Sequence, residues 1–159
     1  MPVAYLLLGS NLGDRAALLR AAREHLARTA GTVTASSALY QTAAWGLADQ
    51  PAFLNQALEI RTALTPAQLL TACLATEQQA GRERLVRWGA RTLDVDILLY
   101  DQRVVDTPTL QIPHPRLPER RFALLPLADI AATVQHPGRG CTVAELLAAC
   151  LDPLAVTRL

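Results

Sequence analysis

The hydrophobic pattern of the first hundred residues alternates between strand and helix. Residues 3–8 form an unbroken apolar run that ends at a glycine-containing turn, which predicts a buried strand. Residues 14–31 place leucine and alanine at the 3.6-residue spacing of an amphipathic helix, with Asp14 as its N-cap. Residues 65–81 open with the capping box Thr-Pro-Ala-Gln and predict a second helix.

Three further segments are typical of strands. Residues 33–40 alternate loosely and contain many small and β-branched residues, and residues 53–62 alternate again after a loop at 41–52. Residues 93–100 alternate two aspartates with apolar residues, the last of which is Leu99. The order β-α-β-β-α-β predicts a ferredoxin-like α+β fold, in which an antiparallel sheet has helices on one face and leaves the other face free to hold a site.

The pattern is weaker beyond residue 100. It indicates two short strands, a helix over residues 122–131 and a last helix that begins with a capping box at residues 142–145. No internal repeat or low-complexity linker divides the chain. We therefore expect one domain over residues 1–159, made of a core at about residues 3–100 and a C-terminal elaboration over residues 101–159.

The amino-acid composition argues against several classes of function. Apolar residues make up 51% of the 159 residues, enough for a core, and the formal net charge of +1 disfavours a nucleic-acid-binding protein. All 15 basic residues are arginine, which excludes both a Walker-type phosphate lysine and a Schiff-base lysine. Any binding of phosphate must therefore use arginine, metal ions or backbone amides.

Cysteine usage and hydropathy indicate the compartment. The three cysteines are odd in number and lack the spacing of metal ligands, which indicates structural thiols in a reducing compartment. The N-terminus does not resemble a secretory signal, and no apolar run is long enough to span a membrane. We expect a cytoplasmic monomer that binds neither nucleic acid nor membranes.

The main candidate for chemistry is the strand with two aspartates. Asp94 and Asp96 share a face with Cα atoms about 6.6 Å apart. Two carboxylates this close repel each other unless cations neutralise them, and hard ions such as Mg²⁺ prefer oxygen ligands. The preceding loop supplies guanidinium groups suited to phosphate oxygens, at Arg82, Arg84, Arg87 and Arg91. The aspartate pair alone, or the arginine-rich loop alone, is more typical of a solvated surface. The two together favour a metal–polyphosphate site.

Several other side chains have a functional and a structural interpretation. His114 lies between two prolines beside arginines and could contact a nucleotide. Trp88 in the arginine loop could stack on a flat ligand, and the strand amide of Asn55 suits the edge of a heterocyclic base. Phe53 and Phe122 are the only phenylalanines, and both could belong to the core.

These motifs together resemble one enzyme family over about residues 4–127. The matching segments are residues 8–12, 40–42, 46, 49–55, 77, 81–82, 87–97, 113–114 and 120–122. The most specific is Arg-Trp-Gly-Ala-Arg-Thr-Leu-Asp-Val-Asp-Ile at residues 87–97. The chain resembles the 6-hydroxymethyl-7,8-dihydropterin pyrophosphokinases, folate-pathway enzymes of ferredoxin-like fold that transfer the β,γ-diphosphate of ATP to a pterin hydroxymethyl group and release AMP.

The resemblance implies a role for each matched position. Catalysis with two Mg²⁺ ions is implied for Arg82, Arg91, Asp94 and Asp96, with both aspartates as metal ligands. ATP binding is implied for Glu77, Arg84, Arg87, Ile97, His114 and Arg120. Pterin binding is implied for Thr42, Ala43, Trp45, Phe53, Asn55, Trp88 and Phe122. The chain departs from the family in having alanine at positions 43, 44 and 90, where proline is usual, and phenylalanine at position 53, where tyrosine is frequent.

Two alternatives compete with this interpretation. An RNA-binding module could use Phe53 and Trp88 for stacking, but aromatic residues make up only 4% of the chain and paired aspartates repel a phosphate backbone. A regulatory fold that senses nucleotides without turnover is the second alternative. Formation of AMP from ATP and the pterin distinguishes both alternatives from the enzyme.

Overall fold

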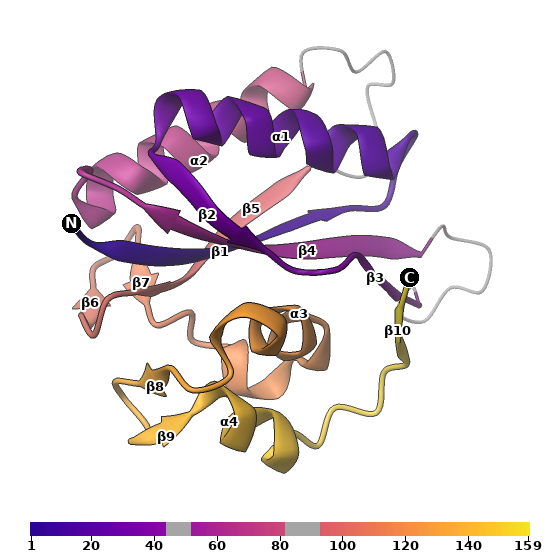
Figure 1. Cartoon of the computed structure of the whole chain (residues 1–159), viewed down its shortest axis with the longest axis vertical. Coiled ribbons are helices and arrows are strands. Elements are labelled where there is room, and N and C mark those ends of the chain that lie inside the picture. Colours follow the sequence, from indigo (N-terminus) through magenta and orange to yellow (C-terminus); the bar gives the residue numbers. More distant parts are fainter. Residues whose placement is uncertain (44–51, 82–92) are drawn as a thin grey trace.

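A computed structural model describes residues 1–43, 52–81 and 93–159 of the chain. In these ranges a central sheet lies between two helical layers (Figure 1). The helices are α1 (Arg15–Thr29), α2 (Pro66–Gly81), α3 (Arg121–Ala131) and α4 (Val143–Ala149), with a 3₁₀ turn η1 (Leu117–Glu119). The sheet contains β1 (Val3–Ser10), β2 (Thr32–Ser36), β3 (Tyr40–Thr42), β4 (Phe53–Arg61), β5 (Asp94–Tyr100) and β10 (Val156–Arg158).

The topology confirms the ferredoxin-like prediction. The strands lie in the order β10, β3, β4, β1, β5, with β2 also paired to β4, and all of these pairs are antiparallel. Two small hairpins lie outside the sheet. They are β6 (Val105–Asp106) with β7 (Gln111–Ile112), and β8 (Gln135–His136) with β9 (Cys141–Thr142).

The predicted helix starts are confirmed by their caps. The Asp14 side chain accepts a hydrogen bond of 3.1 Å from Ala17 N at the start of α1. At α2, Thr65 N donates to Gln68 Oε1 over 2.9 Å and Gln68 N donates to Thr65 Oγ1 over 3.3 Å, which is the expected capping box. Thr142 and Glu145 form the same motif at α4.

The expectation of a free sheet face is wrong. Helices α1 and α2 cover one face, and the C-terminal segment lays α3 and α4 against the other (Figure 1). The reason is that β1 is apolar on both faces. Leu6 and Leu8 pack in the core beneath α1 and α2, whereas Tyr5 and Leu7 pack with α3 and α4. What remains for a site is the part of this second face that α3 leaves uncovered.

Leu99 and Tyr100 lie on the faces opposite to those that the alternation of β5 predicts. The residues from Leu93 to Ile97 follow the predicted alternation, but Leu99 packs in the core on the α3 side. The pairing of β1 with β5 shifts register between Tyr5 and Leu6, which is a bulge that adds one residue to β5. A single extra residue reverses the facing of every position after it.

Strand boundaries also differ from the prediction. The single strand expected at residues 33–40 is two strands, β2 and β3, separated by residues 37–39. Within this interruption, Ser37 Oγ accepts a hydrogen bond of 2.9 Å from Ala57 N. Residues 41 and 42, which were expected in a loop over 41–52, belong to β3, and residues 44–51 of that expected loop lie outside the described residues. The last strand, β10, has no hydrophobic pattern and was not predicted.

In the described ranges, no helix is both long enough and apolar enough to span a membrane.

Candidate functional site

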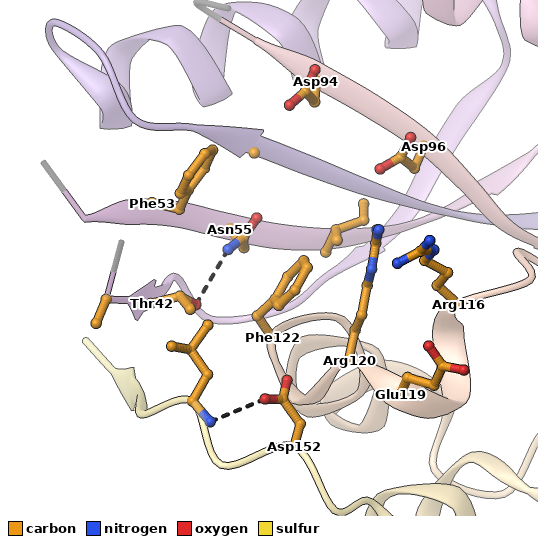
Figure 2. Close-up of a pocket in the computed structure, with 14 residues that line it drawn as sticks. Thr42, Phe53, Asn55, Asp94, Asp96, Arg116, Glu119, Arg120, Phe122 and Asp152 are labelled. Atoms are coloured by element: carbon orange, nitrogen blue, oxygen red, sulfur yellow. Dashed lines mark hydrogen bonds between the residues drawn. The ribbon is translucent and has the colours of Figure 1, made fainter. Parts of the chain in front are cut away.

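A cavity of about 440 Å³ opens between the sheet and the N-terminal end of α3 (Figure 2). Strands β1, β3, β4 and β5 form one side, and the segments around η1, α3 and β10 form the other. The sheet side is lined by Leu7, Gly9, Thr42, Ala43, Phe53, Asn55, Asp94 and Asp96. The opposite side is lined by Arg116, Glu119, Arg120, Phe122, Asp152 and Leu154.

The register of the sheet brings the polar side chains together. Gly9 on β1 is the pairing partner of Asn55 on β4 and of Asp94 on β5, so these three positions form a row across the sheet. Thr42 on β3 pairs with Phe53 on β4, which lies two residues from Asn55 along the strand and therefore on the same face. The prediction that Phe53 and Asn55 share a face with the two aspartates is confirmed (Figure 2).

Like Thr42, Asn55 is a buried polar residue of the cavity floor. Its side chain is buried, and its Nδ2 donates a long hydrogen bond of 3.5 Å to Thr42 Oγ1. On the other side lies Gly9, where an added Cβ atom would be only 2.6 Å from Asn55 Oδ1. The glycine at this strand position therefore leaves space for the amide, which a larger residue would displace.

Two aromatic rings enter the cavity from opposite sides. Phe53 comes from β4 and Phe122 from the first turn of α3, and both are half-buried (Figure 2). The Arg120 guanidinium lies over the Phe122 ring, 5.5 Å from its centroid. The two phenylalanines thus line the cavity and could hold a flat ring between them.

The two aspartates lie on the same wall, as their alternation predicts. Asp94 and Asp96 are half-buried and both line the cavity. Between them, Val95 N donates a hydrogen bond of 2.8 Å to Glu77 Oε2 on α2. Glu77 therefore holds the part of β5 that positions the two carboxylates.

The Cys73 thiol is buried on α2, one turn before Glu77. Burial raises the pKa of Cys73 to about 12, with further contributions from the negative charges of Glu77 and Asp96. The thiol therefore stays protonated at neutral pH. This agrees with its interpretation as a structural residue.

The carboxylates of the cavity are the candidate ligands for a metal ion. Within residues 1–43, 52–81 and 93–159, no group of three or more His, Cys, Asp or Glu side chains could hold a metal ion by itself. Two carboxylates on one wall suit Mg²⁺, which usually takes one or two protein carboxylates and completes its coordination with water and substrate phosphates. The residues present therefore fit Mg²⁺ bound together with a phosphate ligand.

Asp96 also lines a second cavity, of about 430 Å³, along the edge strand β5. Its other lining residues are Leu70, Val95, Ile97, Pro108, Thr109, Leu110, Gln111, His114 and Pro115. Asp96 thus belongs to the walls of both cavities.

His114 is held in one orientation at the second cavity. Its backbone N donates to Leu98 O over 3.0 Å, and its ring Nδ1 accepts a hydrogen bond of 3.2 Å from Arg116 N. Burial lowers the pKa of His114, and the positive charges of Arg120 and Arg116 lower it further against the opposing effect of Asp96. The ring is therefore neutral at neutral pH, and because Nδ1 accepts, its proton lies on Nε2, where it can donate to a ligand.

The structure brings together most of the predicted site residues that it describes. Thr42, Ala43, Phe53, Asn55, Asp94, Asp96, Arg120 and Phe122 meet in the first cavity, and Ile97 and His114 join Asp96 in the second. Glu77 lies behind the aspartate strand. Six predicted residues lie outside the described residues: Trp45, Arg82, Arg84, Arg87, Trp88 and Arg91.

The sequence-based prediction missed several residues of the first cavity. They are Leu7, Gly9, Arg116, Glu119, Asp152 and Leu154. Gly9 was assigned to a turn, although a glycine beside an apolar strand can also mark a close approach, and here it is part of β1. Asp152 and Leu154 had no signal, because tertiary contacts bring them to the cavity: β10 pairs with β3, and Asp152 is hydrogen-bonded to Arg121 of α3.

Comparison with known proteins shows which family has this arrangement. Residues 5–132 match the family described as 7,8-dihydro-6-hydroxymethylpterin-pyrophosphokinase (HPPK). The chain belongs to the HPPK family. This confirms the resemblance inferred from the sequence motifs.

Individual relatives extend the match to HPPK proteins over nearly the whole chain. A 2-amino-4-hydroxy-6-hydroxymethyldihydropteridine pyrophosphokinase of Methylorubrum extorquens is 49% identical and covers 99% of each chain. A protein of the same name from Bacillus subtilis is 48% identical over 84% of this chain and 80% of the relative.

A solved structure supports the HPPK fold independently. The crystal structure of HPPK-DHPS from Plasmodium falciparum matches 94% of this chain with a TM-score of 0.71 at 16% identity, a likeness that shows the fold alone. This chain spans only 43% of that longer protein.

Proposed function

We propose that this chain transfers the β,γ-diphosphate of ATP to the hydroxymethyl group of 6-hydroxymethyl-7,8-dihydropterin and releases AMP. Family membership supports the reaction. The observation on which the site assignment depends is the position of Asp96 in the walls of two cavities. One cavity has the aromatic rings and buried amide that suit a flat heterocycle, and the other lies along β5 beside a neutral imidazole.

The first cavity is proposed as the acceptor site. Phe53 and Phe122 face it from opposite sides and would hold the pterin ring between them. Asn55, together with the backbone of Thr42 and Ala43, would recognise the polar edge of the ring, because an amide offers both donors and an acceptor. Trp45 and Trp88 are proposed as further contacts from outside the described residues.

The second cavity is proposed as the nucleotide site. Ile97 supplies an apolar surface, and His114 offers an Nε2–H donor whose neutral state does not change near pH 7. Arg120 lies on the acceptor side of Asp96 and can contact phosphate oxygens between the two cavities. Arg84 and Arg87 would assist ATP binding, and Glu77 would support the site by holding β5.

Asp94 and Asp96 would hold two Mg²⁺ ions. When bound, the ions would neutralise the polyphosphate and stabilise charge that develops on the transferring group. Arg82 and Arg91 would add guanidinium donors to the same oxygens. In the reaction, the acceptor oxygen bonds to the β-phosphorus in line with the breaking bond to the α,β-bridging oxygen, which leaves with AMP. The acceptor hydroxyl loses its proton to a base for which Asp94 and Asp96 are candidates.

The experiment is an assay for AMP. The purified protein is mixed with ATP, Mg²⁺ and the pterin, and the nucleotides are separated by chromatography. We expect AMP in proportion to diphosphorylated pterin, no AMP when the pterin is omitted, and loss of the reaction after chelation of Mg²⁺. Absence of AMP from the complete mixture, or binding of single-stranded RNA without Mg²⁺, would contradict the proposal.

We also propose that the protein is a single-domain cytoplasmic monomer. The three cysteines are free, which favours a reducing compartment. Light scattering coupled to gel filtration should give the mass of one 17.2 kDa chain. A mass of twice that value would contradict the monomer.

A further inference from the structure

One wall of the acceptor cavity comes from the C-terminal end of the chain. Asp152 and Leu154 line the cavity together with Thr42 and Phe122. Both belong to residues 152–159, which we call the C-terminal strap. The strap lies outside residues 5–132, the range matched by the family comparison. Its contribution to the cavity is therefore a feature of this chain that the family match does not cover.

The far end of the strap is fixed to the sheet. Strand β10 pairs with β3 in a register that sets Val156 opposite Thr42, a residue of the cavity wall. Two further backbone hydrogen bonds extend this pairing. Ala43 N donates to Ala155 O over 3.4 Å, and Leu159 N donates to Leu39 O over 2.9 Å. The strap thus continues the sheet at the edge of the cavity.

The near end of the strap is fixed to α3. Asp152 Oδ2 accepts a hydrogen bond of 3.1 Å from Arg121 N, and its Oδ1 accepts one of 3.0 Å from Leu154 N, which is drawn in Figure 2. The Arg121 guanidinium donates to the backbone oxygen of Asp152 and, over 2.8 Å, to that of Cys150. The carboxylate of Asp152 therefore joins the first turn of α3, which presents Phe122, to the backbone of Leu154.

The exposure pattern shows which strap residue faces the cavity. Pro153 and Ala155 are exposed, whereas Leu154 between them is half-buried and lines the cavity. Both oxygens of the Asp152 carboxylate accept backbone hydrogen bonds from the protein itself. Leu154 therefore supplies apolar surface to the cavity, while Asp152 holds the backbone on which that surface depends.

We propose that Leu154 is a binding residue for the acceptor, and that Asp152 is the residue that positions Leu154 and Phe122. This inference rests on the proposed function, because it assigns the ligand of the first cavity as the pterin acceptor. An apolar side chain at a half-buried wall contributes to affinity through the area it removes from water on ligand binding. Such a contact is made equally in the bound substrate and in the transition state, so its loss raises KM and leaves kcat unchanged.

The test compares three leucine variants. Leu154→Ala should raise the KM for 6-hydroxymethyl-7,8-dihydropterin by roughly tenfold, the effect of removing apolar groups from a substrate pocket. The KM for ATP and kcat should stay within twofold of the unchanged protein. Leu154→Met, which keeps most of the apolar volume, should restore the acceptor KM. Leu151→Ala is the matched control, because this leucine is 94% exposed just before the strap.

The role of Asp152 is tested by comparing the KM for the pterin with the KM for ATP in two variants. Asp152→Ala should raise the acceptor KM without raising the KM for ATP, and Asp152→Asn, which keeps one acceptor oxygen, should lie between. A role in stability alone would lower the melting temperature of both variants and leave the ratio of the two KM values unchanged.

A binding measurement separates failure of this inference from failure of the proposed function. The dissociation constant of the pterin is measured by isothermal titration in the presence of a non-hydrolysable ATP analogue and Mg²⁺. An unchanged constant for Leu154→Ala would overturn the strap assignment even if the enzyme makes AMP. Pterin binding that is tenfold weaker in Leu154→Ala than in the unchanged protein would support the strap assignment. It would do so even if the unchanged protein binds pterin but forms no AMP, because that second result would overturn only the proposed reaction.

Discussion

Gly9 and Asn55 face each other across the β1–β4 pair, and a Cβ atom at Gly9 would lie 2.6 Å from Asn55 Oδ1. The two residues are 46 positions apart in the sequence, so only the pairing of their strands reveals the contact. The absence of a side chain at Gly9 therefore determines where the Asn55 amide can lie. In the proposed reaction, this amide recognises the edge of the acceptor ring.

Gly9→Ala should therefore weaken binding of the pterin acceptor more than binding of ATP. We expect the KM for the pterin to rise about tenfold, because displacement of the amide loses a hydrogen bond to the ligand. The KM for ATP should change little. The control is the same substitution in an Asn55→Ala background, where the clashing oxygen is absent and the added methyl group should cost much less. Equal effects in the two backgrounds would refute the contact.

Asp96 lies in the walls of both cavities, so its removal should affect the whole reaction. Asp96→Asn keeps the shape of the side chain and removes the charge, and kcat/KM should fall at least about 100-fold. Binding of Mg²⁺ in the presence of an ATP analogue should weaken in parallel. Asp106→Asn, at an exposed carboxylate of β6, is the matched control and should retain full activity. Normal Mg²⁺ affinity in the Asp96 variant would exclude the residue as a metal ligand.

Glu77 should affect stability and activity through β5, because its carboxylate accepts a hydrogen bond from Val95 N. Glu77→Ala leaves Val95 N without the oxygen that accepts its hydrogen bond, and the free energy of unfolding should decrease by about 1–2 kcal/mol. The Mg²⁺ concentration for half-maximal activity should rise, because β5 positions both aspartates. Gln79→Ala, at an exposed site on the same helix, provides the control in urea unfolding and in the activity assay. A variant with unchanged stability would show that this hydrogen bond is dispensable.

The hairpin of β8 and β9 should make stability depend on pH. Burial, with a contribution from the positive charge of Arg139, lowers the pKa of His136 below its ordinary value of 6.5. Its Nδ1 accepts hydrogen bonds of 3.1 Å from both Gly138 N and Arg139 N, and protonation of this nitrogen abolishes them. The folded state thus resists protonation.

The sign of the effect follows from proton uptake. Because the folded pKa is depressed, the unfolded chain gains its proton first as the pH falls, and the free energy of unfolding decreases below about pH 6.5. His136→Asn offers an uncharged acceptor and should flatten this dependence in urea titrations between pH 7.5 and 5. His114, whose pKa is also lowered, contributes to the dependence that remains. An identical slope in the variant and the unchanged protein would rule out His136 as the origin.

The sequence by itself determined both helices of the core, most of the strands and the chemistry within them. The apolar periods and capping residues of α1 and α2 are local signals, and the structure confirms both helices. The alternation of Asp94 and Asp96 within one strand is equally local, and it correctly predicted that both carboxylates share a wall. The segment at residues 87–97 is the most specific of several short motifs that together indicated the HPPK family.

Only the tertiary structure decided which distant residues meet. The contact of Gly9 with Asn55, the shared wall at Asp96 and the approach of Leu154 to Thr42 all depend on strand register and on packing of α3. The bulge that reverses Leu99 has no sequence signal either. Periodicity reports the direction of a side chain relative to its own strand or helix. It contains no information on the neighbouring element, which is selected by burial and hydrogen bonding across the whole chain.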